Sequence, residues 1–277
     1  MRQLYADRIH FAYHPPEKVH EVPHRYDCIA DSILMRRPAK DIRLLEVGAE
    51  SPMGPSHLSN KLQVPPVNFE VADISGRAVS LLRSEGWQAE CVDISQQRTS
   101  YADGRFDVVV MSEVLEHLID PDFAIIEAKR VLKPDGLLYI TTPNLAAWFN
   151  RFLLFAGTQP LFTETSVEWT FGRSGFLPRS RPVGHLRLYT YRALKEFLDY
   201  HGLKVIELRG LPVEGAIVPI APLAWLDATM SVFPKLAAGL FVVATPSHPL
   251  SSLSPSSSVQ VTTVPPSTGT RSKRSEG

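Results

Sequence analysis

The sequence predicts an α/β fold in which helices flank a parallel β-sheet. Short apolar runs alternate with segments of helical periodicity between residues 42 and 245, as in successive right-handed strand–helix–strand units. One run, FDVVVM at residues 106–111, is continuous and β-branched, which is typical of a strand buried on both faces. Several runs end in an acid or a glycine, where open parallel sheets bind their ligands.

The first strand is predicted at residues 42–47, within the stretch LLEVGAE at residues 44–50 around which the chain is organised. This stretch is a buried apolar run that ends in Gly48, and glycine permits a tight turn. Before it, the apolar spacing within residues 25–37 indicates a helix that Pro38 ends.

The next elements follow in the order helix, strand, helix, strand. A helix is expected to begin near residue 55 or 56, and a second strand is expected at residues 67–72, before Asp73. Ser75 is a suitable N-cap for a helix that runs to residue 82. A short strand at residues 89–92 then ends at Asp93.

After the buried strand at residues 106–111, Asp120 and Pro121 open a helix. The sequence Pro-Asp-Gly at residues 134–136 predicts a turn before a strand at 137–141. A helix is expected within residues 145–155, and an aromatic, arginine-rich irregular segment follows at 158–184. A long irregular insertion of this kind is usually functional or disordered, and its aromatic residues favour a lid over a substrate.

In the last third of the chain, Thr190 caps a helix predicted at residues 191–201. Strands are expected at residues 204–208 and 240–245. Between them, residues 210–238 are apolar and interrupted by prolines, which indicates a loop with a partly exposed helix.

Three parts are therefore expected along the chain. Residues 1–40 form an N-terminal extension with a helix, residues 41–245 form the domain with a lid-like insertion at about 144–184, and the Ser/Thr/Pro-rich residues 246–277 are disordered. Four histidines near the N-terminus fit no metal-binding spacing and are interpreted as surface residues: His10, His14, His20 and His24.

Composition limits the classes of function. The formal net charge is zero, which argues against nucleic-acid binding through bulk charge. The two cysteines lie far apart and suggest no disulfide framework, and the N-terminus lacks the apolar core of a signal peptide, so a reducing, cytoplasmic location is expected. The longest apolar window, residues 216–226, is about half of the ~20 residues that a membrane-spanning helix needs.

The order of six motifs resembles the class I S-adenosylmethionine-dependent methyltransferases, most closely the UbiG-like group. The motifs are LLEVGA (44–49), FEVADIS (69–75), CVDI (91–94), FDVVVMSEVLEHLIDP (106–121), RVLKPDGLLYITTPN (130–144) and HLRLYTYRALKEFLDYHGL (185–203). The resemblance implies a Rossmann-like, mostly parallel sheet of seven strands in the order 3-2-1-4-5-7-6. In that fold the last strand is antiparallel and helices cover both faces.

The resemblance also implies residues that bind S-adenosylmethionine. Asp73 matches the acid that takes the ribose hydroxyls, although it is also placed to cap a helix, and Asp93 matches the acid that receives adenine, although a turn explains it too. The complete implied set is Glu46, Gly48, Ala49, Asp73, Ile74, Asp93, Ile94, Ser112 and Glu113. One position departs from the family pattern, because Glu50 stands where a second glycine is usual and its charge would repel the cofactor carboxylate.

Three residues after the fourth strand carry the predicted chemistry. Glu113, Glu116 and His117 have the spacing i, i+3, i+4, which would place them on one face if the segment is helical. With His185 they could bind Mg²⁺ or Mn²⁺, as a similar set does in metal-dependent methyltransferases that include enzymes acting on RNA 3′ ends. The alternative is that the glutamates are framework and His117 is a base without metal. The predicted catalytic residues are His117, Glu116 and His185.

The leading hypothesis is therefore a methyltransferase that acts on an oxygen of a small-molecule or lipid-like acceptor. Glu50 motivates the alternative of a non-catalytic methyltransferase-like binding module. A metal-dependent RNA 3′-end methyltransferase is the third hypothesis, and the neutral charge makes nucleic acid an unlikely partner. Residues 210–238 could contact a membrane surface or a protein partner, although a buried helix explains the same residues. The oligomeric state is not predicted.

Overall fold

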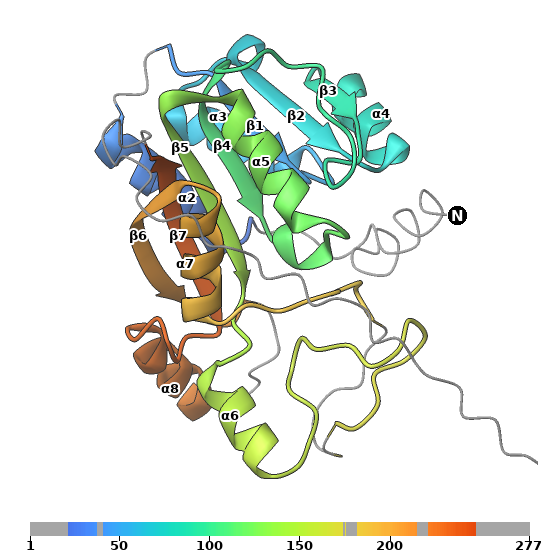
Figure 1. Ribbon diagram of the computed structural model, residues 1–277, viewed down its shortest axis with the longest axis vertical. Coiled ribbons are helices and arrows are strands. Elements are labelled where there is room, and N and C mark those ends of the chain that lie inside the picture. The colour runs from blue at the N-terminus through green and yellow to red at the C-terminus, as the bar shows by residue number, and fades with distance from the viewer. Residues whose placement is uncertain (1–21, 38–40, 174, 176–181, 215–220, 248–277) are drawn as a thin grey trace, which may run out of the picture. The chain divides into compact units, whose positions relative to one another are not determined.

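Seven strands form one sheet in the order β3-β2-β1-β4-β5-β7-β6 in the computed structural model (Figure 1). The structure describes residues 22–37, 41–173, 175, 182–214 and 221–247. Of the disordered tail predicted at residues 246–277, residues 248–277 lie outside the described residues, as do His10, His14 and His20. The prediction is wrong for Pro246, which is the last residue of a strand paired with Leu203. The strands are β1 (Leu44–Val47), β2 (Phe69–Asp73), β3 (Gln88–Cys91), β4 (Phe106–Ser112), β5 (Leu132–Pro143), β6 (Leu203–Leu211) and β7 (Gly239–Pro246).

The first five strands are parallel, and β7 is antiparallel to both of its neighbours, β5 and β6. The predicted fold class and strand order are therefore confirmed. The carboxyl ends of β1, β2, β4 and β5 meet at one edge of the sheet, where parallel sheets bind ligands.

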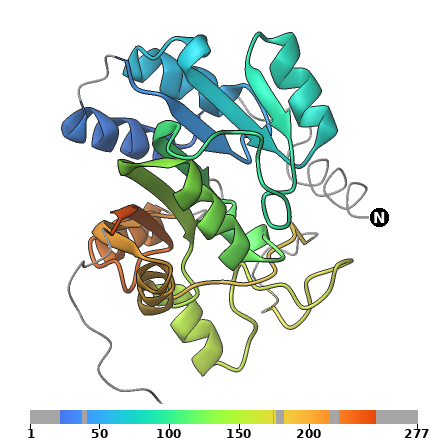
Figure 2. The ribbon, with the colours of Figure 1, turned by 45° about the horizontal axis from the view of Figure 1, so that its top comes forward.

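Helices cover both faces of this sheet (Figures 1 and 2). Alternate residues of each strand supply the two cores, so Leu44 packs with α2 and α3 whereas Leu45 packs with α5 and α7. The helices are α2 (His24–Arg36), α3 (Met53–Leu62), α4 (Gly76–Ser84), α5 (Pro121–Val131), α6 (Trp148–Phe155), α7 (Tyr191–Tyr200) and α8 (Ala221–Ser231), with short 3₁₀ helices at Pro66–Asn68 and Leu115–His117.

The predicted helix caps explain where three of the helices begin. Ser75 accepts the Ala78 N–H at 3.3 Å, Asp120 accepts the Phe123 N–H at 2.9 Å, and Thr190 accepts the Ala193 N–H at 3.2 Å. These bonds satisfy backbone donors that lack partners in the first turn of a helix. No described helix is long and apolar enough to cross a membrane.

The sequence predicted a turn at residues 134–136 followed by a strand at 137–141, and this start of the strand is wrong. The strand β5 begins at Leu132, and the pairing register passes from Phe106–Leu132 to Val108–Leu137. Residues 133–136 therefore form a bulge near the start of β5, because these four residues lie opposite a single residue of β4, Asp107. The Pro-Asp-Gly sequence bends the strand instead of ending it.

Candidate functional site

The turn after β1 requires a glycine for two independent reasons. Gly48 has a φ of +73°, which side chains of L-residues rarely adopt, and its N–H donates to the Ala72 carbonyl at 2.7 Å. A Cβ added at this position would lie 2.6 Å from Cγ2 of Val114. The glycine therefore allows the ends of β1 and β2 and the loop after β4 to approach closely.

Glu46 projects from β1 into the core on the α2 side of the sheet. Its Oε1 accepts the hydroxyl of Tyr26 at 2.7 Å, and its Oε2 is buried without a hydrogen-bond partner among the described residues. Burial raises the pKa of the Glu46 carboxyl to about 7. A buried oxygen without a partner is costly unless a ligand supplies a donor.

Asp73 joins the end of β2 to the loop after β1. Its Oδ1 accepts the Ser75 N–H at 2.7 Å, and its Oδ2 accepts the Glu50 N–H at 3.1 Å. Glu50 has a φ of +56°, so it adopts the backbone conformation that favours glycine at this position. The glycine-like shape of the loop is therefore kept although the residue is a glutamate.

Asp93 lies in a turn after β3, which is the alternative that the sequence left open for this residue. Its Oδ1 accepts from the backbone and the hydroxyl of Ser95 at 3.0 and 2.6 Å, and its Oδ2 accepts from Gln96 at 2.6 Å. The next residue, Ile94, is buried in the core on the α5 side. The carboxylate thus orders the turn that would face adenine in the predicted site.

An arginine from α2 reaches the end of β4. The Arg25 Nε donates to the Ser112 hydroxyl at 3.1 Å, and its backbone N–H donates to Glu214 at 2.7 Å. Its positive charge also moderates the raised pKa values of the buried Glu46 and Glu116 carboxyls. Sequence reasoning placed this helix against the sheet but gave Arg25 no part in the site.

The residues that follow β4 do not form the predicted helical face. Glu113 has a φ of +55° and donates its N–H to the Thr141 carbonyl, and only the 3₁₀ turn Leu115–His117 follows. The helical arrangement is therefore wrong, because the chain turns sharply between Glu113 and Glu116. Glu116 and His117 are instead brought together with His185.

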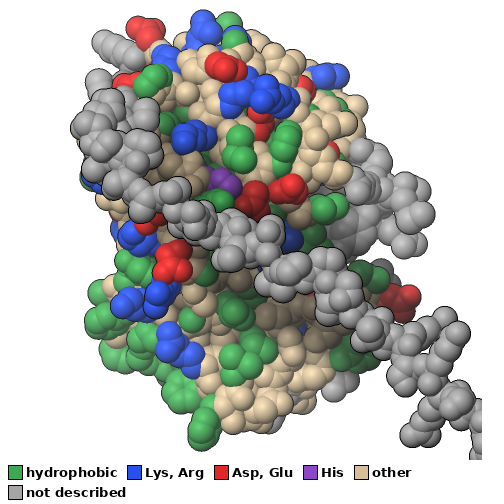
Figure 3. Space-filling view, in the orientation of Figure 1, with side chains coloured by type: hydrophobic (Ala, Val, Ile, Leu, Met, Phe, Trp, Pro, Cys, Tyr) green, Lys and Arg blue, Asp and Glu red, His purple; other side chains and the backbone are tan. Residues whose placement is uncertain are grey.

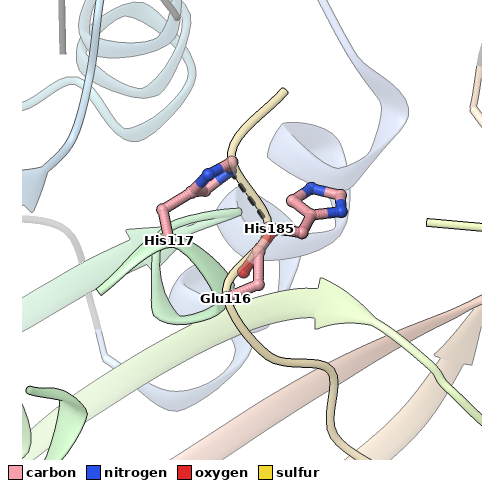
Figure 4. A group of neighbouring side chains, drawn as sticks. All are labelled: Glu116, His117 and His185. Atoms are coloured by element: carbon pink, nitrogen blue, oxygen red, sulfur yellow. Dashed lines mark ion pairs between the residues drawn. The ribbon is translucent and has the colours of Figure 1, made fainter. Parts of the chain in front are cut away.

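Figure 4 shows Glu116, His117 and His185 facing one another. One ligand atom from each lies within 4.8 Å of the others, and the centroids of the two imidazole rings are 4.8 Å apart. Glu116 is fully buried; its Oε2 accepts the Thr142 hydroxyl at 2.9 Å, whereas its Oε1 has no hydrogen-bond partner among the described residues. This Oε1 lies 4.0 Å from His117 Nε2.

Both imidazoles are held by backbone carbonyls at the same ring nitrogen. His117 Nδ1 lies 3.1 Å from the Gly184 oxygen, and His185 Nδ1 lies 2.7 Å from the Phe162 oxygen. Because a carbonyl only accepts, each neutral ring carries its proton on Nδ1 and keeps the Nε2 lone pair. Burial, and then the neighbouring His185, lower the pKa of His117 to about 4, whereas burial and the charge of Glu113 raise the pKa of Glu116.

A glutamate from the irregular segment fixes the position of His185. The Glu164 carboxylate accepts three consecutive backbone N–H groups, from Val183 at 2.5 Å, Gly184 at 2.9 Å and His185 at 3.1 Å. The carbonyl of the same Gly184 orients His117. Glu164 therefore supports both histidines, and no local sequence signal marked it.

Two further polar residues near this edge, Asn144 and Arg187, have structural roles. Asn144 is buried; its side chain accepts the Ala146 N–H and donates to the Ala237 carbonyl. The Arg187 guanidinium donates to the Leu118 and Ile119 carbonyls. These contacts join loops across the site.

The fold and this constellation define the class to which the protein belongs. Residues 19–208 match the family model described as "Methyltransferase domain", which covers more than half of the chain. The chain therefore belongs to the methyltransferase domain family, within the class I S-adenosylmethionine-dependent methyltransferases that the sequence motifs predicted.

Two curated relatives are each named "Ubiquinone biosynthesis O-methyltransferase". The protein from Sinorhizobium fredii is 25% identical over 179 residues, which cover 63% of this chain and 65% of the relative. The protein from Actinobacillus pleuropneumoniae is 40% identical over 57 residues, or 21% of this chain and 24% of the relative. The matched segment thus spans less than two thirds of the length of either relative.

Solved structures share the fold at low identity. The 1,6-didemethyltoxoflavin-N1-methyltransferase of Burkholderia thailandensis is 13% identical, covers 89% of this chain and 88% of its own, and gives a TM-score of 0.53. The [4+2]-cyclase SpnF is 18% identical, with coverages of 80% and 81% and a TM-score of 0.51. Because the fold carries different reactions, the reaction of this chain must be argued from its site.

Proposed function

We propose that the protein transfers a methyl group from S-adenosylmethionine to an oxygen of a small-molecule or lipid-like acceptor. The cofactor supplies a methyl group on a positively charged sulfur, which is already a good leaving group. The chain must therefore align the acceptor and accept its hydroxyl proton. The observation that carries the proposal is the placement of His117: its Nδ1 lies 3.1 Å from the Gly184 oxygen, and its Nε2 lies 4.0 Å from Glu116 Oε1, which has no hydrogen-bond partner among the described residues.

The residues after β1 and β2 fit the cofactor in chemistry. No described residue donates to the buried Oε2 of Glu46, and the ammonium group of the cofactor would supply a donor. Asp73 lies at the end of β2 beside the loop after β1, and its carboxylate oxygens, which accept hydrogen bonds, would take the two ribose hydroxyls. Asp93 and Ile94 would receive adenine. Arg25, whose guanidinium contacts Ser112 and forms an ion pair with Glu214, would lie near the cofactor carboxylate.

The proton of the acceptor would pass to His117. With a pKa near 4, this imidazole is neutral at neutral pH and accepts a hydrogen bond from a hydroxyl through Nε2. A full positive charge on the buried ring is unfavourable, so proton transfer is favoured only as the oxygen gains its methyl group. Glu116, whose pKa burial raises, offers a second basic atom for the same proton.

The class of acceptor is supported by two findings. The curated relatives named above carry an O-methyltransferase name. The ring centroids of Phe162 and His185 are 6.4 Å apart, and those of Phe149 and Phe162 are 6.2 Å apart. An apolar acceptor that presents a hydroxyl would suit this aromatic border.

The test uses labelled cofactor with phenols, catechols and long-chain alcohols, each paired with its amine analogue and accompanied by an RNA oligonucleotide. We expect methylation of hydroxyl compounds alone, and a loss of about 10²-fold or more in kcat for His117→Gln with unchanged binding of S-adenosylhomocysteine. His24→Gln, an exposed histidine at the start of α2, is the control. Transfer to amines or RNA, or full turnover in His117→Gln, would contradict the proposal.

A second candidate is that the same cluster binds a divalent metal during the reaction. In many metal sites each histidine donates its second ring nitrogen to a carbonyl or carboxylate, and both His117 and His185 do so here. Glu116 would be the third ligand; Glu113, predicted as a fourth, is not within the compact set. Bound Mg²⁺ or Mn²⁺ would lower the pKa of an acceptor hydroxyl.

Titration with Mn²⁺ alone, followed by its electron paramagnetic resonance signal, tests this candidate without turnover. We expect a single site in the intact protein and its loss in His185→Ala, while Glu168→Gln, in the same segment, binds normally. Turnover that survives EDTA, together with no Mn²⁺ binding, would leave His117 as the base without metal.

A further inference from the structure

We propose that the protein docks on an anionic lipid bilayer through one apolar face, independently of the reaction proposed above. This α6–α8 face consists of α6, α8 and the two residues after α8. Its large exposed apolar side chains are Phe152, Leu154, Phe155, Leu223, Trp225, Val232 and Phe233.

Most of these large apolar side chains pack against little of the protein and expose more than half of their surface. Phe155 is 95% exposed, Val232 74%, Trp225 72%, Phe152 68% and Phe233 58%. Figure 3 shows hydrophobic side chains gathered on the lower left of the molecule, where Figure 1 has α6 and α8. Single exposed apolar residues are common, but a gathered set marks an interaction surface.

Polar contacts join α6 to α8 and to the loop after it, so the face is one surface. The Trp148 Nε1 donates to the Asp227 carboxylate at 2.9 Å, and its backbone N–H donates to the Leu236 carbonyl at 2.8 Å. The Arg151 guanidinium donates to the Lys235 carbonyl at 3.1 Å. These hydrogen bonds fix the position of α6 relative to α8, and with it the positions of their exposed apolar side chains.

The charges of the face favour a bilayer as its occupant. Residues 148–157 contain no acid, and the single acid of residues 221–238, Asp227, is 2% exposed. Arg151 and Lys235 are exposed at the same face. A surface with aromatic rings, basic side chains and no exposed acid is complementary to anionic headgroups over an acyl layer.

The face is also connected to the candidate active site. Phe149 of α6 packs edge-to-face against Phe162, and the carbonyl of Phe162 accepts from His185. A lipid-like acceptor at the bilayer surface would therefore meet the aromatic border of the site. This step rests on the proposed function, whereas docking itself does not.

Co-flotation of the full chain with phosphatidylcholine vesicles, with and without phosphatidylglycerol and without cofactor, tests the docking. We expect binding to the anionic vesicles, reduced at least about tenfold in the double variant Phe152→Ala/Phe155→Ala. Lys235→Gln should weaken binding about fivefold, as one basic residue near an anionic surface does. Met35→Ala/Val67→Ala is the matched control, since these residues are 70% and 68% exposed outside the face.

Trp225 gives a second readout that is independent of turnover. Its emission should shift to shorter wavelength on addition of anionic vesicles, and the shift should be absent in Trp225→Phe. No flotation with anionic vesicles, or equal flotation of the double variant, overturns the proposal. A dimer that the double variant dissociates, in a protein that does not bind vesicles, would assign the face to a second copy of the chain.

Discussion

The site proposed above has a cofactor half and an acceptor half, and the two are built in different ways. In the cofactor half, Gly48 and Asp73 immediately follow or end strands and bond to the backbone of the neighbouring loop or strand. In the acceptor half, His185 lies in an irregular segment and is fixed by Phe162 and Glu164, 23 and 21 residues earlier.

The difference teaches where rigidity comes from in each half. The hydrogen-bonded sheet fixes the strand ends, so their side chains need few extra contacts. The acceptor half depends on a few long-range bonds to one carboxylate and two carbonyls. Substitutions in the first half should therefore affect stability and cofactor binding together, and substitutions in the second should affect turnover more than cofactor binding.

The largest effect is expected from Gly48→Ala. The positive φ and the clash with Val114 together should lower the free energy of unfolding by about 2–4 kcal/mol and abolish cofactor binding. Gly157→Ala is the control, because Gly157 has a φ of +69° and open space around its Cβ position, so only about 1–2 kcal/mol should be lost. Urea unfolding and calorimetry with S-adenosylhomocysteine measure both; equal losses would refute the close-approach argument.

Glu164→Ala tests the acceptor half. Loss of three backbone contacts should displace both histidines and lower kcat by roughly 10–100-fold, because small misplacements of reacting groups are costly. The affinity for S-adenosylhomocysteine should stay within about twofold. Glu168→Ala, an exposed glutamate of the same segment, should change neither value. A weaker cofactor affinity in Glu164→Ala would show that the halves are not separable.

The raised pKa of Glu46 predicts a pH dependence of stability in the cofactor half. The folded-state value of about 7 exceeds the ordinary value of 4.5, so its stabilising effect is full below pH 4.5 and is lost as pH rises through 7. This loss should be on the order of 3 kcal/mol. Urea unfolding from pH 4.5 to 8 should show it, with a flatter profile in Glu46→Gln.

His117 acts in the opposite direction, because its folded pKa of about 4 lies below the ordinary value of 6.5. The neutral imidazole therefore contributes stability that is fully present above pH 6.5 and is lost as the pH falls through 4. The double variant Glu46→Gln/His117→Gln separates the two contributions. A Glu46→Gln profile parallel to that of the wild type would contradict a buried, protonated Glu46.

The smallest effect is expected from Glu50→Gly. Glycine removes the cost of the φ of +56°, so the free energy of unfolding should rise by about 1 kcal/mol, and cofactor affinity should rise severalfold if the charge of Glu50 opposes the cofactor carboxylate. Gln63→Gly, also at +56°, should give the stability gain alone. A wild type that binds no cofactor while Glu50→Gly does would favour the non-catalytic hypothesis.

The sequence by itself determined the sheet order through its motifs and the position of most helices. Ser75, Asp120 and Thr190 marked helix starts correctly because a cap acts within three residues of itself. Gly48 and Asp73 could be selected because strand ends converge at one edge of a parallel sheet. Local chemistry and strand periodicity carry this information.

Only the tertiary structure decided the rest. The turn at Glu113 broke the expected helical face, the bulge at residues 133–136 replaced a turn, and Tyr26, Arg25 and Glu164 joined the site from distant segments. Such contacts close long loops, and the entropic cost of closing them is offset by the whole fold. No short sequence pattern therefore predicts them. A residue at a strand end inherits its position from the sheet, whereas a residue in a loop obtains it from partners far along the chain.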